Sequence, residues 1–209
     1  NPDGWKDVDR LKKGSIANDF FVTDDGEILL GFNFQAEFNL KTVETEDLKK
    51  NHIIQFYWLN RKGVVTSDMI LEQRRTKRFV IDVWGSKGVA NFDEIFGKPL
   101  QAITDDGVIA AGRSTQFTIT IYDSVGRSKN SIKFPFEKTP LKRETLINKY
   151  KNKTSDIRLN AYKTLDLPQS WPALEEIFFD AQNRLWVSTI VPDLTVYKWF
   201  IFNLEGQLL

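Results

Sequence analysis

Few residues in this chain can carry covalent chemistry. The 209 residues include no cysteine and a single histidine, His52. Disulfides, thiolate metal sites, cysteine nucleophiles and sites that need two imidazoles are therefore excluded. His52 begins an apolar run, and no G-x-S-x-G motif supplies it with a nucleophile. We interpret His52 as a structural histidine at the end of a strand.

Paired carboxylates suggest metal or acid–base chemistry, but their context favours turns. Asp24-Asp25 and Asp105-Asp106 each precede a glycine, and neither pair has the alternating oxygen ligands and later glutamate of a calcium loop. Asp beside Gly is typical of a hairpin turn. Glu175-Glu176 lie in a β-rich run, where adjacent side chains point to opposite faces. We therefore predict no catalytic residue and no metal ligand here.

The elements that hold these residues are repeated hairpins. Two alternating apolar runs joined by a polar turn occur three times, around Gly26, Gly107 and Asn183. A second hairpin follows each time, after a run rich in β-branched and aromatic residues, with turns at Asn60–Gly63, Asp123–Gly126 and Asn203–Gly206. Two hairpins make a four-stranded antiparallel meander, which is the unit of a β-propeller.

We therefore predict an all-β fold in which residues 1–209 form part of a single β-propeller domain. About three blades are visible, at roughly 16–72, 96–135 and 173–209, and the third lacks a complete fourth strand. A β-sandwich is the alternative, but chance hairpins would rarely repeat two turn types in the same order. The insertion from Thr42 to Lys50 is expected to hold a helical turn or an irregular loop.

One helix is predicted in an insertion at 139–165, lying between adjacent blades. Thr139 can cap it and Pro140 suits its first turn, while Pro168 and Pro172 follow its end. Apolar residues recur at helical spacing on one face, with a break expected near Asn152–Ser155; these residues are Ile147, Tyr150, Thr154, Ile157, Ala161 and Leu165.

The repeat also points to candidate ligand-binding residues. Six residues after each first turn the blades carry Phe32, Arg113 and Thr189. Ligands of propellers usually bind on loops at one mouth of the channel, so residues that differ at a shared position are where specificity would lie. Arg113 is the most polar of the three and could hold an anion, or form an ordinary ion pair at a strand end.

Charge is balanced overall but uneven along the chain. Lys and Arg number 29 against 28 Asp and Glu. Basic residues cluster in the predicted helix and just after the first blade; they are Lys142, Arg143, Lys149, Lys151, Lys153, Arg158, Lys163, Arg74, Arg75, Lys77 and Arg78. The helix predicts an acidic ligand or, alternatively, a solvated face. We expect no nucleic-acid binding, because no stacking platform accompanies a basic groove, and no transmembrane segment.

The repeated Asp-Asp-Gly and Asp/Asn-x-x-Gly pattern resembles the six-bladed β-propeller proteins of bacteria, relatives of NHL-repeat and TolB-like propellers. The resemblance implies an exported location (periplasmic, cell-surface or secreted) and a non-enzymatic binding or scaffolding module without a cofactor. The alternative is a propeller hydrolase or lactonase with a metal in the central channel. Residues of the types that hold such a metal are Asn18, Asn33, Asp82 and Asn183, although no spacing singles them out.

Three blades leave an open arc. An uncovered apolar sheet face of several hundred Å² would cost on the order of 10 kcal/mol, which is comparable to the whole stability of a domain. We therefore expect a partner: the remainder of the propeller, a second copy or another protein that closes the ring. The absence of an initial Met, and the final residues just after a turn signal, indicate an interior or processed piece of a longer chain.

Overall fold

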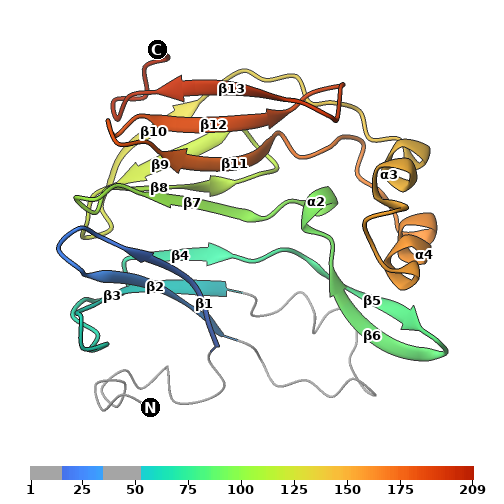
Figure 1. Cartoon of the computed structure of the whole chain (residues 1–209), viewed down its shortest axis with the longest axis horizontal. Helices are drawn as coiled ribbons and strands as arrows, with labels where there is room; N and C mark the ends of the chain where they lie inside the picture. Colours follow the sequence, from blue (N-terminus) through green and yellow to red (C-terminus); the bar gives the residue numbers. More distant parts are fainter. Residues whose placement is uncertain (1–15, 35–52) are drawn as a thin grey trace.

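The computed structural model describes residues 16–34 and 53–209, with the side chains of 16–18 and 34 left out. In this part of the chain three antiparallel sheets stack one on another (Figure 1). Sheet 1 has the order β1-β2-β3-β4, sheet 2 the order β7-β8-β9-β10 and sheet 3 the order β11-β12-β13. The all-β prediction is confirmed, and the arrangement is consistent with partial propeller blades. His52 and the segment Thr42–Lys50 lie outside the described residues.

The strand bounds follow the predicted blades closely. Sheet 1 consists of β1 (Ile16–Val22), β2 (Ile28–Phe34), β3 (Ile53–Leu59) and β4 (Leu71–Arg74). Sheet 2 consists of β7 (Pro99–Ile103), β8 (Ile109–Arg113), β9 (Thr118–Tyr122) and β10 (Ser128–Lys133). Sheet 3 consists of β11 (Leu174–Phe179), β12 (Leu185–Ile190) and β13 (Tyr197–Phe202). Beyond β13 the chain turns back, and Leu208 forms an isolated bridge with Phe202.

The six repeated turns share one geometry. The last residue of each turn has a left-handed φ; these residues are Gly26, Gly107, Asn183, Gly63, Gly126 and Gly206. In each turn its N–H donates to the carbonyl three residues earlier, as from Gly107 to Thr104 at 3.0 Å. The predicted turns are confirmed, and their last residues are of the two types that adopt positive φ most readily, glycine and asparagine.

The sheets pack face to face. Between sheets 1 and 2 the buried residues are Leu29, Ile54, Phe56, Trp58, Ile70, Leu71, Ile109 and Ala111. Between sheets 2 and 3 the core is larger and richer in phenylalanine, with Phe117 contacting Phe200 at 5.4 Å and Phe202 at 6.0 Å between ring centroids. Each meander therefore buries at least one apolar face against a neighbouring sheet.

A separate hairpin that the repeat did not predict joins the first two sheets. It consists of β5 (Arg78–Val83) and β6 (Ser86–Asn91), followed by the short helix α2 (Asp93–Phe96). Its two-residue turn is Trp84-Gly85, and both residues have positive φ, as a tight hairpin requires. Trp84 is 87% exposed at the tip.

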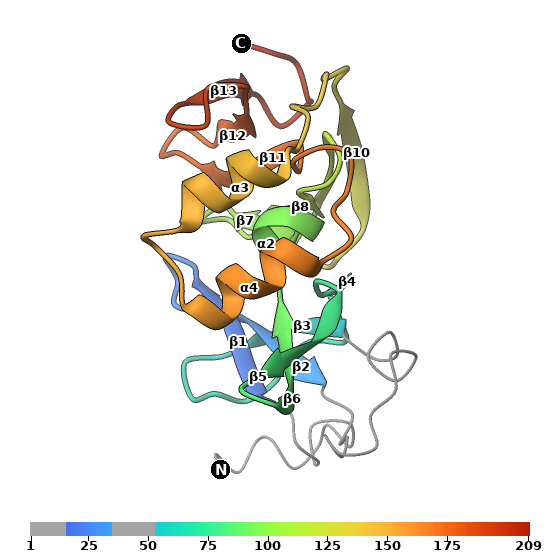
Figure 2. The same ribbon diagram turned by 90° about the vertical axis from the view of Figure 1, so that its right-hand side faces the viewer.

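The helical insertion forms two helices, α3 (Arg143–Tyr150) and α4 (Asp156–Thr164), with the predicted break between them. They lie with α2 along one side of the stack, the side that faces the viewer in Figure 2. The predicted start at Thr139 is wrong, because the Thr139 hydroxyl donates to the carbonyl of Ile190 at 3.0 Å instead of capping a helix. Ser155 does cap α4, accepting from the Arg158 N–H.

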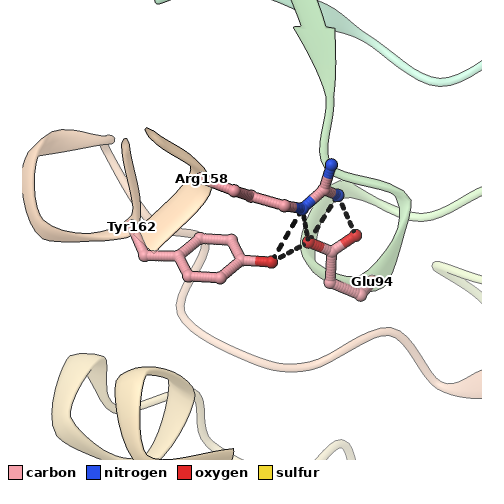
Figure 3. A network of polar contacts seen from close by, with 3 residues as sticks. All are labelled: Glu94, Arg158 and Tyr162. Atoms are coloured by element: carbon pink, nitrogen blue, oxygen red, sulfur yellow. Dashed lines mark hydrogen bonds and ion pairs between the residues drawn. The ribbon is translucent and has the colours of Figure 1, made fainter. Parts of the chain in front are cut away.

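A polar network ties α4 to α2 (Figure 3). The Arg158 guanidinium donates from Nη2 to both carboxylate oxygens of Glu94 at 2.7 Å. The Tyr162 hydroxyl donates to the same carboxylate and accepts from Arg158 Nε at 3.0 Å. The guanidinium also stacks over Phe92, 4.7 Å from the ring centroid. These contacts hold the helical side of the molecule on its apolar core.

Candidate functional site

A pocket of about 380 Å³ opens where β4 of sheet 1 meets β8 and β9 of sheet 2. Its lining combines two arginines with hydroxyl and amide side chains; it consists of Leu71, Glu72, Gln73, Arg74, Ala111, Gly112, Arg113, Thr115, Gln116, Thr118, Thr120 and Tyr122. Arg113, the most polar of the residues predicted from the repeat, is therefore part of a pocket. Its volume falls in the lower range of small-molecule sites.

The hollow arises because small residues end β8. Ala111 occupies the position that Leu30 has in sheet 1 and Val187 in sheet 3, counted from the first turn. Gly112 follows it, and a Cβ there would come within 2.6 Å of the Thr118 carbonyl oxygen. Glycine thus permits the close approach of β8 and β9, and the short side chains leave space against sheet 1.

Two guanidinium groups share this space. Arg113 donates from Nη1 to the carbonyl of Arg74. Burial lowers the pKa of Arg113, the charge of Arg74 lowers it further, and Asp93 acts in the opposite direction. Among the described residues, neither arginine has a carboxylate within 4.0 Å. The pocket therefore contains positive charge that the described part of the chain does not neutralise by direct ion pairs.

The polar groups beside the two arginines have hydrogen bonds of their own. The Glu72 carboxylate accepts from Gln55 Nε2 at 2.8 Å. Gln73 donates through Nε2 to the carbonyls of Leu100, at 3.1 Å, and Gly112, at 3.4 Å. Its Oε1 is buried and has no hydrogen-bond partner in the described structure.

The three residues at the shared repeat position are not brought together. Phe32 is fully buried and packs edge-on against Tyr57, with ring centroids 6.0 Å apart. Thr189 is also fully buried, and its hydroxyl donates to the carbonyl of Lys198 at 3.0 Å. Neither side chain is accessible to solvent in this conformation. A ligand-binding role stays a prediction for all three, and the pocket gives Arg113 the structural context for it.

Several of the carboxylates and metal-site candidates have local partners. Asp25 and Asp106 accept from the hydroxyls of Thr23 and Thr104 within their turns, as turn chemistry requires. Asp82 accepts from the Gly85 N–H at 2.9 Å, and Asn183 is a turn residue. Asn33 is buried, while the side chain of Asn18 is outside the described part. Residues 19–33 and 53–209 contain no group of three His, Asp or Glu that could hold a metal.

The basic residues of the helical insertion divide into two groups. Arg143 donates to the carbonyls of Tyr162 and Leu165, the latter at 2.9 Å, and so caps the end of α4. Lys149 lies 5.1 Å above the Trp171 ring, where burial lowers its pKa and Glu175 opposes this shift. The remaining lysines, Lys142, Lys151, Lys153 and Lys163, are exposed. An acidic ligand for this face stays a prediction.

Sequence reasoning missed most of the pocket. The alternating Thr118, Thr120 and Tyr122 give β9 a polar face toward sheet 1. The equivalent run in sheet 3 has Lys198, Phe200 and Phe202. Comparing the repeats position by position, rather than only at the strand ends, would have shown this polar face. Arg74 stands out in the sequence only by its charge, because nothing near it in the chain indicates that it lies beside Arg113.

Comparison with known proteins gives a weak likeness. No protein-family model and no curated protein matches the chain. A gluconolactonase from Xanthomonas campestris is similar at TM-score 0.36 and 16% identity, over 92% of this chain and 45% of that one. Virginiamycin B lyase from Staphylococcus aureus gives TM-score 0.32 and 11% identity, over 92% of this chain and 68% of the lyase. The catalytically inactive variant of this lyase with quinupristin gives TM-score 0.30 and 9% identity, over 95% of this chain and 70% of the variant. The chain thus spans less than half of the gluconolactonase.

Proposed function

We propose that this chain is a non-enzymatic, propeller-type binding module, and that the pocket between sheets 1 and 2 takes a small hydroxylated carboxylate. The observation that carries the proposal is the pair Arg74 and Arg113, which line one pocket without a carboxylate within 4.0 Å among the described residues. A half-buried, unneutralised guanidinium favours an anion, and its planar fork suits a carboxylate or phosphate.

The rest of the lining narrows the ligand class. Thr115, Thr118 and Thr120 add residues with side-chain hydroxyls to the lining. Groups of this kind bind hydroxyls of a ligand, whereas an apolar anion would leave them unpaired. A carboxylate that also carries hydroxyl groups would satisfy both parts of the lining.

Calorimetric titration with tartrate tests this proposal. Tartrate carries two carboxylates and two hydroxyls, and succinate is the matched probe without hydroxyls. We expect tartrate to bind more tightly than succinate. Arg113→Gln should weaken tartrate binding about 10- to 100-fold, the effect of losing one charge-assisted contact.

Arg127→Gln is the control, because Arg127 is an exposed arginine outside the pocket. It should leave the affinity unchanged. No heat of binding at millimolar tartrate would remove the proposal, and so would an equal loss of affinity in the two variants. Equal binding of tartrate and succinate would retain an anion site but remove the hydroxyl specificity.

The alternative function, a hydrolase or lactonase with a channel metal, has no supporting arrangement in the described residues. A large thermal shift on adding Ca²⁺ or Zn²⁺ would support it, because tight binding to the folded state raises its stability. The proposed setting is an exported bacterial protein with a six-bladed propeller. This setting rests on the resemblance of the repeated turns alone. Separately, no helix in the described part of the chain is long and apolar enough to cross a membrane.

A further inference from the structure

Each sheet has a forward face, which turns toward the next sheet along the chain. Near the third strand of each sheet, the residues on the forward face lie two, four and six positions before the first residue of the second turn. In sheets 1 and 2 these residues are buried against the next sheet; they are Trp58, Phe56 and Ile54, then Ile121, Ile119 and Phe117. In sheet 3 the same positions hold Ile201, Trp199 and Tyr197. Trp199 is 38% exposed and Tyr197 is 44% exposed.

The other strands of sheet 3 extend this uncovered forward face. Phe178 of β11 is 40% exposed, although its counterpart in sheet 2, Ala102, is buried. The rings of Phe178 and Trp186 stack at 5.9 Å with an interplanar angle of 9°. Trp199 meets both rings edge-on, at 5.6 and 6.1 Å. Together they form an aromatic surface of the kind that elsewhere in the chain is covered by a sheet.

The opposite end of the stack carries a rear face with exposed apolar residues in the described part of the chain. Rear residues turn toward the preceding sheet, and in sheet 3 Ile177 is one of them, with 7% exposure. Its counterpart in sheet 1 is Phe20, which is 69% exposed. Val22, two residues further along β1, is 56% exposed. An apolar rear face is therefore present on sheet 1.

The internal contacts between sheets are directional and repeat. Trp58 of sheet 1 donates from Nε1 to the carbonyl of Ser124, in the second turn of sheet 2, at 2.6 Å. Asn130 of sheet 2 donates in the same direction to the carbonyl of Glu205, in the second turn of sheet 3, at 2.6 Å. A forward face thus receives the rear face and the second turn of the following sheet. The forward face of sheet 3 has the aromatic residues for such a contact, and Phe178, Tyr197 and Trp199 on it are exposed.

We propose that a second copy of this chain supplies the covering sheet: the rear face of sheet 1 in one copy covers the forward face of sheet 3 in the other. Each copy has, in the described part of the chain, one uncovered forward face and one uncovered rear face. Two copies joined head to tail therefore cover all four of these faces with two identical contacts. Such a contact closes into a two-fold ring, here of six sheets. Each of the two contacts joins a forward face to a rear face. A polar substitution on either face is present in both copies, so it should disrupt both contacts and break the assembly.

Light scattering of the 209-residue chain tests the ring. We expect a dimer, with twice the 24.2 kDa mass of the chain. Trp199→Glu on the forward face and Phe20→Glu on the rear face should each shift the mass to that of the monomer. Trp84→Glu is the matched control, because Trp84 is exposed on a hairpin outside both faces, and it should stay dimeric. Circular dichroism checks that every variant is folded.

Mixing the two face variants gives the sharper test. The Phe20→Glu chain keeps an intact forward face and the Trp199→Glu chain keeps an intact rear face, so a mixture should form a heterodimer through one contact. A dimer made by two forward faces would instead persist in Phe20→Glu alone, which overturns the head-to-tail arrangement. A chain that stays monomeric up to about 100 μM overturns the second copy and leaves another protein or a further segment as the cover. A series of oligomers larger than the dimer would overturn ring closure.

Discussion

At the scale of single residues, the network of Glu94, Arg158 and Tyr162 shows how burial changes acid–base behaviour. Burial raises the pKa of Tyr162 to about 12, and its hydrogen bond to Glu94 acts in the same direction, while Arg158 opposes it. The phenol is therefore held in its protonated form at a pH where an exposed tyrosine ionises. Burial also raises the pKa of Tyr150 and Tyr197.

This shift predicts a loss of stability in alkali. Below a pH of about 10 the Tyr162 hydroxyl is protonated in the folded and unfolded states, so its contribution is fully present. Between about pH 10 and the folded pKa of about 12, only the unfolded state loses the proton, so the free energy of unfolding falls. Urea unfolding at pH 8 to 12 measures this fall.

Tyr162→Phe is the comparison for that measurement. It should cost about 1 kcal/mol at pH 8 through the lost hydrogen bonds and should make the alkaline fall shallower. The fall in stability that remains in this variant is expected from Tyr150 and Tyr197, whose pKa values are also raised by burial. An identical pH profile in the variant and the parent chain would contradict the role assigned to Tyr162.

At the scale of elements, the turns have two structural roles. Their left-handed glycines reverse the chain, and some of them also allow a turn to touch the preceding sheet. At Gly126 an added Cβ would lie 2.3 Å from the Ile70 carbonyl oxygen, with φ at +80°. At Gly85, the hairpin tip, φ is +81° and an added Cβ meets nothing within 4 Å. Comparing Gly126 with Gly85 therefore distinguishes the effect of backbone conformation from the effect of contact between sheets.

Alanine substitution at these two glycines measures the difference. Gly85→Ala should cost about 1–2 kcal/mol, the penalty for a side chain in the left-handed region. Gly126→Ala should cost about 2 kcal/mol more, because the methyl group also forces sheets 1 and 2 apart. Chemical denaturation gives both values. Equal losses would show that the turn of sheet 2 does not pack on sheet 1 as described.

At the scale of the whole molecule, stability depends on what covers the two ends of the stack. Exposed aromatic groups such as Phe178 and Trp199 gain about 25 cal/mol per Å² of apolar area when they are buried. The inferred ring would bury them between copies, so folding and association would be coupled. Protein concentration then becomes a variable of stability.

A concentration-dependent melting temperature is the expected consequence. Raising the chain concentration about 100-fold should raise Tm by about 3 °C, since association favours the folded state by mass action. The Trp199→Glu variant should melt at the same temperature at every concentration. Differential scanning calorimetry at several concentrations makes the comparison, and a constant Tm for the parent chain would count against coupled association.

The sequence by itself determined the all-β class, the order of the hairpins and the six turns, because turn chemistry depends on residues that are neighbours in the chain. It also predicted the break between α3 and α4 and singled out Arg113. The tertiary structure alone decided that Arg74 lies beside Arg113 and that Phe32 and Thr189 are buried. Likewise, nothing local distinguishes Trp199, which is exposed, from its counterpart Phe56, which is fully buried. The physical reason is that burial depends on which distant segment covers a side chain, and residue type and spacing do not carry that information.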